Sequence, residues 1–190
     1  QQMDGLESLF RTQAEEKHLD IRFENRYSSP RQLLADGLRL NQVLVNLLGN
    51  ALKYSRPDGH VWLTVRETEE EKGFSNLYFQ VRDDGIGIAP EKQQLIFRQF
   101  EQADNSENAR KQGTGLGLAI SRRIVRMMDS DIKLESEPGK GSSFSFNVKL
   151  QPVSGEKTTV TSQPEEISFP GKRILVVEDN ELNMEIICTI

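Results

Sequence analysis

Residues 36–54 of the chain are DGLRLNQVLVNLLGNALKY. Apolar side chains recur there at every third or fourth position, which is the spacing of one face of an α-helix. These side chains are Leu40, Val43, Leu44, Leu47, Leu48 and Ala51. The stretch therefore predicts an amphipathic helix whose apolar face packs on a core and whose flanks carry polar groups.

One flank of this predicted helix carries Asn46, Asn50 and Lys53, which face the same way because they are separated by four and then three residues. A polar border beside solvent is one interpretation. Asparagine is a poor helix former, however, and two of them lower the helix propensity, which favours a functional interpretation. Amide oxygens suit Mg²⁺, and an ammonium neutralises phosphate as a point charge.

A glycine-containing turn, Asp83-Asp84-Gly85-Ile86-Gly87-Ile88, follows a predicted strand over 77–83. Alternation along the strand places Asp83 on its apolar face, where a buried carboxylate needs a partner such as an adenine amine. Capping of a turn is the alternative role, and we expect Asp84 to perform it. Gly85 and Gly87 would let the backbone approach a flat ligand.

A second glycine stretch, Gly113-Thr114-Gly115-Leu116-Gly117-Leu118-Ala119, opens a predicted helix over 116–128. Unpaired amides and the dipole at a helix N-terminus favour phosphate. The stretch is not a P-loop, because no Gly-Lys-Ser/Thr follows, and it is not a dinucleotide-binding turn, because no strand leads into it. On its own it is equally consistent with a flexible loop before a helix.

The remaining patterns predict a chain that alternates helices and strands. Helices are expected over 1–18 and 91–100, a polar loop over 101–114, and strands over 19–26, 61–67, 132–137 and 143–149. Residues 151–170 have the composition of a linker. The last stretch, 171–190, begins with a buried-type strand but is too short to bury a core of its own.

The composition excludes several classes of protein. Hydrophobic residues make up 36 % of the 190 residues, charged residues 28 %, and the net charge of −5 gives no general reason to bind nucleic acid. A single cysteine excludes an intrachain disulfide and a cysteine zinc site. No apolar run reaches the length of about 20 residues that spans a bilayer.

Taken in order, these segments resemble the catalytic domain of sensor histidine kinases over residues 19–150. The motifs are NxxxN followed by AxKY, VRDDGIGI, IFRQFEQ, GTGLGLAI and SEPGKGSSFSF. The resemblance implies an α/β two-layer sandwich, with a mixed β-sheet and helices packed on one face. Type II topoisomerase, MutL and heat-shock-ninety ATPases share this fold.

The resemblance also implies ATP and Mg²⁺ as ligands. It assigns the metal to Asn50, assisted by Asn46, and assigns adenine recognition to Asp83. Residues 101–114 would form a lid in which Arg110 or Lys111 reaches the γ-phosphate. The other nucleotide contacts implied are Lys53, Tyr54, Gly85, Ile86, Gly87, Ile88, Phe97, Gly113, Thr114, Gly115, Leu116, Gly117 and Leu118.

Two histidines and one amide bear on the reaction. ATPases of this fold keep an acid where this chain has Asn46, and an amide cannot activate water, so transfer to another group is favoured over hydrolysis.

Neither His18 nor His60 is followed directly by an acid, as the phosphoacceptor histidine of this family would be. We therefore expect the acceptor on a dimerisation domain upstream, with residues 1–18 as its last helical turns. An ATPase and a non-catalytic nucleotide-binding module stay open as alternatives.

The sequence KRILVVEDNELNMEI near the C-terminus resembles the start of a receiver domain, with Glu178 and Asp179 at the positions of its acidic pair. It implies a hybrid kinase with a truncated receiver, and hence a response regulator or attached receiver as partner. The family further implies a homodimer and a cytoplasmic domain of a membrane-bound parent protein.

Overall fold

The computed structural model describes residues 2–26, 33–71, 74–98, 100 and 115–152, all of which fall in the compact unit Gln1–Ser154. Its helices are α1 (Gln2–Glu16), α2 (Gly37–Tyr54) and α4 (Gly117–Arg126), with short 3-10 turns at η1 (Pro90–Lys92) and η2 (Leu95–Phe97). The strands are β1 (Asp20–Arg26), β2 (Leu33–Leu34), β3 (His60–Glu71), β4 (Phe74–Asp83), β5 (Lys133–Glu137) and β6 (Gly141–Pro152). Residues 151 and 152 of the linker predicted over 151–170 instead belong to β6, which extends its pairing with β2. The rest of that linker and the receiver-like stretch over 171–190 lie outside the described residues.

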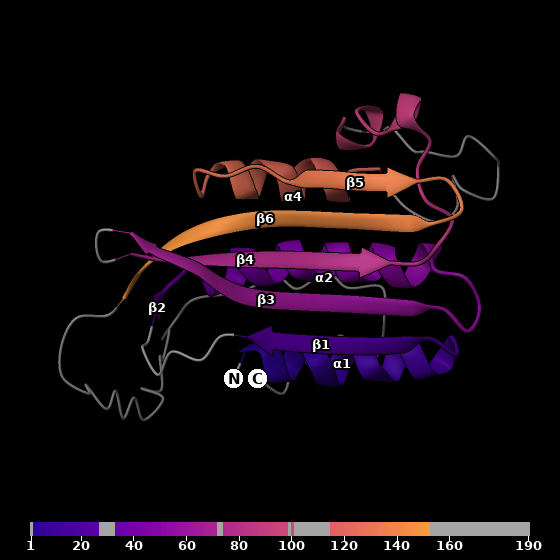
Figure 1. Cartoon of the computed structure of the whole chain (residues 1–190), viewed down its shortest axis with the longest axis horizontal. Helices are drawn as coiled ribbons and strands as arrows, with labels where there is room; N and C mark the ends of the chain where they lie inside the picture. The colour runs from indigo at the N-terminus through magenta and orange to yellow at the C-terminus, as the bar shows by residue number, and fades with distance from the viewer. Residues whose placement is uncertain (1, 27–32, 72–73, 99, 101–114, 153–190) are drawn as a thin grey trace, which may run out of the picture. The chain divides into compact units, whose positions relative to one another are not determined.

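The described strands form one mixed sheet. Its order is β1-β3-β4-β6-β2, with β5 also paired to β6. The β1–β3 pair is parallel, whereas β3–β4, β4–β6, β5–β6 and β2–β6 are antiparallel. Figure 1 shows α1, α2 and α4 behind the sheet, on one face of it. The predicted two-layer sandwich with a mixed sheet is therefore confirmed.

The core lies between the sheet and α2, as the periodicity of residues 36–54 predicts. Val43, Leu44, Leu47 and Leu48 of α2 are each at most 2 % exposed. The helix begins where the Asp36 side chain accepts the Arg39 amide at 3.1 Å. In the sheet, alternate residues of β4 are buried, and Phe79 stacks on Phe146 of β6 with ring centroids 5.1 Å apart.

One predicted helix is wrong. Instead of a helix over 91–100, the chain forms the two separate 3-10 turns η1 and η2. A helix this short is marginal without packing, so tertiary contacts decide its form. Burial of Ile96 and the edge-on contact of Phe97 with Phe144, at 6.4 Å between centroids, fix η2 against the core.

Element ends differ elsewhere by a few residues. The first helix ends at Glu16 instead of residue 18, because Lys17 and His18 form a turn whose amides donate to Ala14 and Glu15. The helix predicted over 116–128 ends at Arg126, and β3, β4 and β6 extend beyond their predicted bounds. In the described part of the chain no helix is both long and apolar enough to cross a lipid bilayer.

Candidate functional site

The C-terminal half of α2 lies between the two glycine stretches. At one end the Ile86 amide donates to the Tyr54 carbonyl at 3.2 Å, and a side chain added at Gly85 would collide with that carbonyl. At the other end a side chain at Gly117 would collide with Asn46 Oδ1. Tyr54 is eight positions after Asn46 in the helix, a distance of about 12 Å along its axis. This stretch, Asn46–Tyr54 with the two glycine segments at its ends, is called the cradle below.

Asp83 supplies a buried carboxylate at the first end of the cradle. It ends β4 on the inner face of the sheet and is 6 % exposed, as alternation along the strand predicts. Its Oδ1 accepts the Gly85 amide at 2.9 Å and the Ser142 amide at 3.3 Å, while Oδ2 accepts no hydrogen bond within the described residues. Burial raises the pKa of Asp83, and the two backbone hydrogen bonds oppose that rise.

Asp84 points away from Asp83 and caps a turn, which confirms the role predicted for it. Its Oδ1 accepts the His60 amide at 2.9 Å, and its Oδ2 lies 3.1 Å from His60 Nδ1. Burial acts to raise the pKa of Asp84, but the hydrogen bonds and charge of His60, with the charge of Arg56, lower it overall. His60 is therefore a structural partner of Asp84.

The first glycine segment is also attached to the β5–β6 hairpin. The Ile88 amide donates to Ser136 Oγ at 2.8 Å, and Gln93 Nε2 donates to the carbonyls of Ile88 and Ser136 at 3.0 and 2.9 Å. Gly87 has a φ of 68°, and a side chain there would collide with the Glu137 carbonyl. Backbone packing alone therefore requires a glycine at position 87.

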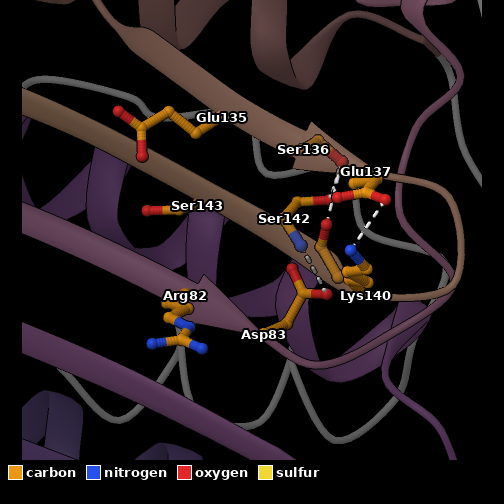
Figure 2. A pocket seen from close by; sticks show the side chains of 9 residues that line it. Arg82, Asp83, Glu135, Ser136, Glu137, Lys140, Ser142 and Ser143 are labelled. Carbon is orange, nitrogen blue, oxygen red and sulfur yellow. Dashed lines mark hydrogen bonds and ion pairs between the residues drawn. The ribbon is translucent and has the colours of Figure 1, made fainter.

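A hollow of about 320 Å³ opens beside Asp83 at this hairpin (Figure 2). Its walls are formed by the end of β4 and by both strands of the hairpin, and it is lined by Arg82, Asp83, Glu135, Ser136, Glu137, Lys140, Gly141, Ser142 and Ser143. None of these residues belongs to α2. The hollow therefore adjoins the cradle and shares Asp83 with it, but it is a different space.

The polar flank of α2 meets several different neighbours. Asn46 Nδ2 donates to Ser121 Oγ of α4 at 2.9 Å, and Lys53 Nζ lies 4.8 Å from the centroid of the Tyr54 ring. Asn50 is half-buried between them, and its amide makes no hydrogen bond within the described residues. A half-buried amide whose oxygen is available fits the coordination chemistry of Mg²⁺.

Phe97 and Leu118, predicted as nucleotide contacts, pack against the core. Arg122 lies over the Phe97 ring at 4.8 Å and makes a two-pronged ion pair with Asp131, at 2.7 and 2.8 Å. Ile88 is also partly buried against the core, whereas Ile86 is 61 % exposed. Packing therefore accounts for Phe97 without a ligand.

The second glycine segment is described only from Gly115 onward. The Gly115 carbonyl accepts the Phe100 amide at 3.1 Å, and α4 begins at Gly117, after Leu116, with no side-chain cap. Its first amides are thus not capped by a side chain. The other predicted contacts of the lid, Arg110, Lys111, Gly113 and Thr114, lie outside the described residues.

Comparison with known proteins identifies the family. Residues 35–152 match the family described as histidine kinase-, DNA gyrase B-, and HSP90-like ATPase. The aerobic respiration control sensor protein ArcB of Escherichia coli is 37 % identical over 180 residues, which are 94 % of this chain and 22 % of ArcB. The autoinducer 2 sensor kinase/phosphatase LuxQ of Vibrio vulnificus is 35 % identical over 184 residues, or 95 % and 21 % of the two chains. The chain thus spans about a fifth of the length of these relatives.

Solved structures agree with the sequence match. Full-length ShkA, crystallised in complex with AMPPNP, superposes with a TM-score of 0.67 and 30 % identity, covering 81 % of this chain and 30 % of ShkA. The nucleotide-free catalytic domain of the histidine kinase ThkA gives a TM-score of 0.65 at 26 % identity, covering 80 % and 93 % of the two chains. The chain belongs to the family of histidine kinase-, DNA gyrase B- and HSP90-like ATPases, and within it resembles the catalytic domains of sensor histidine kinases.

Proposed function

We propose that this chain binds Mg-ATP in the cradle and donates the γ-phosphate to a histidine on a dimerisation domain outside the chain. The observation that carries the proposal is the placement of Asp83 and Gly117 at opposite ends of one polar helix flank. Membership of the ATP-binding family and the likeness to the AMPPNP complex of ShkA support a nucleotide there.

The two ends of the cradle suit the two ends of ATP. Oδ2 of Asp83, which accepts no hydrogen bond from the described part of the chain, would accept the adenine amine, because both backbone amides donate to Oδ1. The uncapped start of α4 would face the phosphates. Asn50 would supply an amide oxygen to Mg²⁺, and Lys53 would neutralise phosphate charge. Bound Mg²⁺ would offset the negative charge that develops on the transferred phosphoryl group.

Transfer is favoured over hydrolysis because the cradle offers no base at Asn46. The side-chain amide of Asn46 is committed to Ser121 Oγ, and an amide takes up no proton near neutral pH. Positioning and charge neutralisation are sufficient for phosphoryl transfer to an acceptor that approaches from outside. A GHKL-type ATPase is the alternative, and it predicts steady phosphate release by the chain alone.

The acceptor would lie outside the chain. His60 is engaged by Asp84 at 3.1 Å and lies 3.9 Å from Asp20, and His18 is exposed at the α1–β1 junction. We propose that the parent is a homodimeric, membrane-anchored hybrid kinase whose receiver begins near residue 171. In that arrangement the phosphate passes from ATP to histidine and then to an aspartate of a receiver or response regulator.

Two measurements on the chain with γ-labelled ATP test this function. The first follows acid-labile phosphate on the chain, and the second follows release of inorganic phosphate. For the chain alone we expect no acid-labile phosphate and no steady release of inorganic phosphate. When a separately prepared dimerisation domain is added, we expect that domain to become labelled. Acid-labile label on His18 or His60 would contradict the proposed acceptor. Steady phosphate release that disappears in Asn46→Ala would favour the ATPase.

A further inference from the structure

The residue after Asp83 is held from several directions by the turn between α2 and β3. The amide of Asp84 donates to the His60 carbonyl at 3.3 Å, and its carbonyl accepts Arg56 Nε at 2.8 Å. Its carboxylate accepts the His60 amide at 2.9 Å and lies 3.1 Å from the His60 ring. Both backbone groups and the side chain of Asp84 are therefore fixed by residues 56–60.

The turn is shaped to bring the Asp84 carboxylate close. A side chain at Gly59 would lie 2.7 Å from both Asp84 Oδ1 and the Arg56 carbonyl, which is closer than real Cβ contacts allow. Gly59 therefore leaves the space that Asp84 occupies. The Gly59 carbonyl also accepts the amide of Asp20 at 2.9 Å, which ties the same turn to the start of β1.

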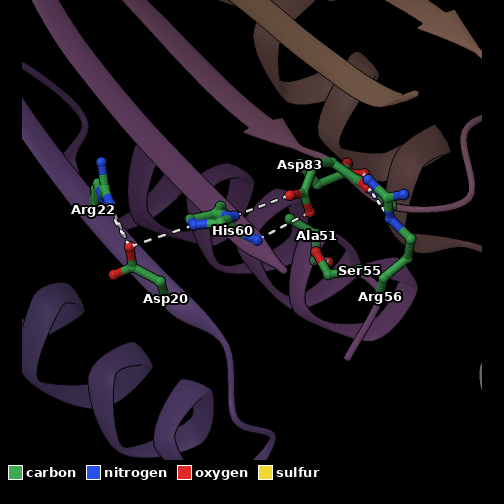
Figure 3. Close-up of polar contacts among 9 residues, drawn as sticks. Asp20, Arg22, Ala51, Ser55, Arg56, His60 and Asp83 are labelled. Atoms are coloured by element: carbon green, nitrogen blue, oxygen red, sulfur yellow. Dashed lines mark hydrogen bonds and ion pairs between the residues drawn. The ribbon is translucent and has the colours of Figure 1, made fainter. Parts of the chain in front are cut away.

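His60 lies between two acidic side chains, Asp20 at the start of β1 and Asp84 just after the end of β4. Its Nδ1 lies 3.1 Å from Asp84 Oδ2. On the other edge of the ring, Nε2 is 3.9 Å from Asp20 Oδ2, which Arg22 also contacts (Figure 3). Arg22 holds the same Asp20 oxygen, with its Nε at 2.8 Å, and the His60 ring stacks on Trp62 at 5.5 Å. The ring is thus oriented on both edges and on one face, so that it can hold Asp84 in one position.

We propose that His60 is a positioning residue for base recognition: through Asp84 it fixes the loop that aims the Asp83 carboxylate at adenine. The inference rests on the proposed role of Asp83. Asp83 Oδ1 is already used by the Gly85 and Ser142 amides, so the direction of Oδ2 depends on the backbone at 83–85. That backbone is the part that His60, Arg56 and Asp84 hold together.

The expected consequence is a loss of base selectivity. Adenine offers an amine donor to a carboxylate, whereas guanine presents a carbonyl acceptor at the equivalent ring position. A loop that no longer aims Oδ2 weakens ATP binding more than GTP binding. If His60 had a purely structural role, His60→Ala would lower the stability of the fold and weaken the binding of ATP and GTP by the same factor.

The test is a set of Mg-ATP and Mg-GTP dissociation constants for the wild-type chain, His60→Ala, Asp84→Ala and the double variant. We expect His60→Ala to raise the dissociation constant of Mg-ATP about tenfold, equivalent to about 1.4 kcal/mol, and that of Mg-GTP by a smaller factor. Because His60 acts through Asp84, the double variant should be no weaker than Asp84→Ala. His60→Asn, whose side-chain amide nitrogen can take the place of Nδ1 as a donor to Asp84, should recover most of the selectivity.

Matched controls separate the possible failures. His18→Asn changes the other histidine at a position with a φ of 54°, which asparagine tolerates, and should leave both nucleotides unaffected. If Asp83→Asn does not weaken ATP binding, Asp83 does not recognise adenine, and the positioning role of His60 is contradicted as well. If Asp83→Asn weakens ATP but His60→Ala does not, or if the two losses simply add in the double variant, the positioning role is overturned alone.

Discussion

The side-chain amide of Asn46 in α2 donates to Ser121 Oγ in α4, with 2.9 Å between the two atoms. Ser121 is 2 % exposed, and the contact joins helices whose sequence positions are 75 residues apart. It places the start of α4 beside the polar flank of α2. One of the residues predicted from the sequence as a ligand thus has a structural partner as well.

Removing this hydrogen bond should destabilise the fold and disturb the phosphate end of the cradle. Ser121→Ala leaves a part-buried amide without its partner, and we expect a loss of about 1 kcal/mol in the free energy of unfolding. Chemical denaturation measures it. If Ser121→Ala and Asn46→Ala were additive in the double variant, the two side chains would not act as a pair.

Gly117 and Gly49 offer a matched pair of glycine substitutions. A methyl group at Gly117 would collide with Asn46 Oδ1, whereas one at Gly49 meets nothing within 4 Å. We expect Gly117→Ala to lower the free energy of unfolding by about 1–3 kcal/mol through overpacking and to weaken ATP binding. Gly49→Ala, in the interior of α2, should instead stabilise the helix by up to about 1 kcal/mol. Equal effects of the two changes on ATP binding would contradict the close contact of Gly117 with α2.

Asp83 should make ATP binding depend on pH. Its pKa is raised by burial, and ligand binding needs the ionised carboxylate, so affinity should fall as the pH drops through that raised pKa. Titrations at a series of pH values for wild type and Asp83→Asn separate the pH dependence of the proposed Asp83–adenine contact from the protonation of the nucleotide itself. An identical pH profile for both proteins would exclude Asp83 as the titrating group.

The same burial predicts that Asp83 lowers the stability of the chain at neutral pH. A raised pKa means that the folded state favours the neutral form, so stability increases as the pH falls through that pKa. Asp83→Asn removes the charge and keeps an oxygen for the Gly85 and Ser142 amides. Its melting temperature at pH 7 should therefore exceed that of wild type. A lower value would show that the ionised carboxylate stabilises the fold.

Asp131 should contribute in the opposite direction. Hydrogen bonds from Arg122 and then Arg126 lower its pKa despite partial burial, so its contribution is present above about pH 4 and is lost as the pH falls further. Asp131→Asn should cost about 1 kcal/mol at pH 7, since both partners are partly exposed. Asp129→Asn, at an exposed neighbouring position, is the control. The difference in free energy of unfolding between wild type and Asp131→Asn should become smaller as the pH is lowered below about 4.

Local periodicity was sufficient for the parts of the site that lie on regular elements. Alternation along β4 places Asp83 inward, and the helical repeat places Asn46, Asn50 and Lys53 on one flank. Periodicity gives the face of an element but not the neighbour that the face meets. That Asn46 contacts Ser121 follows only from the packing of α2 on α4.

The residues that sequence reasoning missed act across long separations. Ser142 bonds to Asp83 over 59 residues, and Gln93 bonds to Ser136 over 43. Neither residue belongs to a helical or strand repeat that points to the site. The serine after Gly139-Lys140-Gly141 is the nearest signal, since the pairing of Arg82 in β4 with Ser143 in β6 brings it beside the end of β4. The two-residue strand β2 is likewise too short to produce an alternating pattern.

Calorimetric titration of Mg-ATP into the wild-type chain and Asp83→Asn tests the central claim most directly. A hydrogen bond to a charged group contributes about 1.5–3 kcal/mol, so the variant should bind about 10–100-fold more weakly while remaining folded. Saturable binding by wild type, with that loss in the variant, is the predicted result. No binding by the wild-type chain, or equal affinity in the two proteins, would contradict the assignment of the cradle as an ATP site read by Asp83.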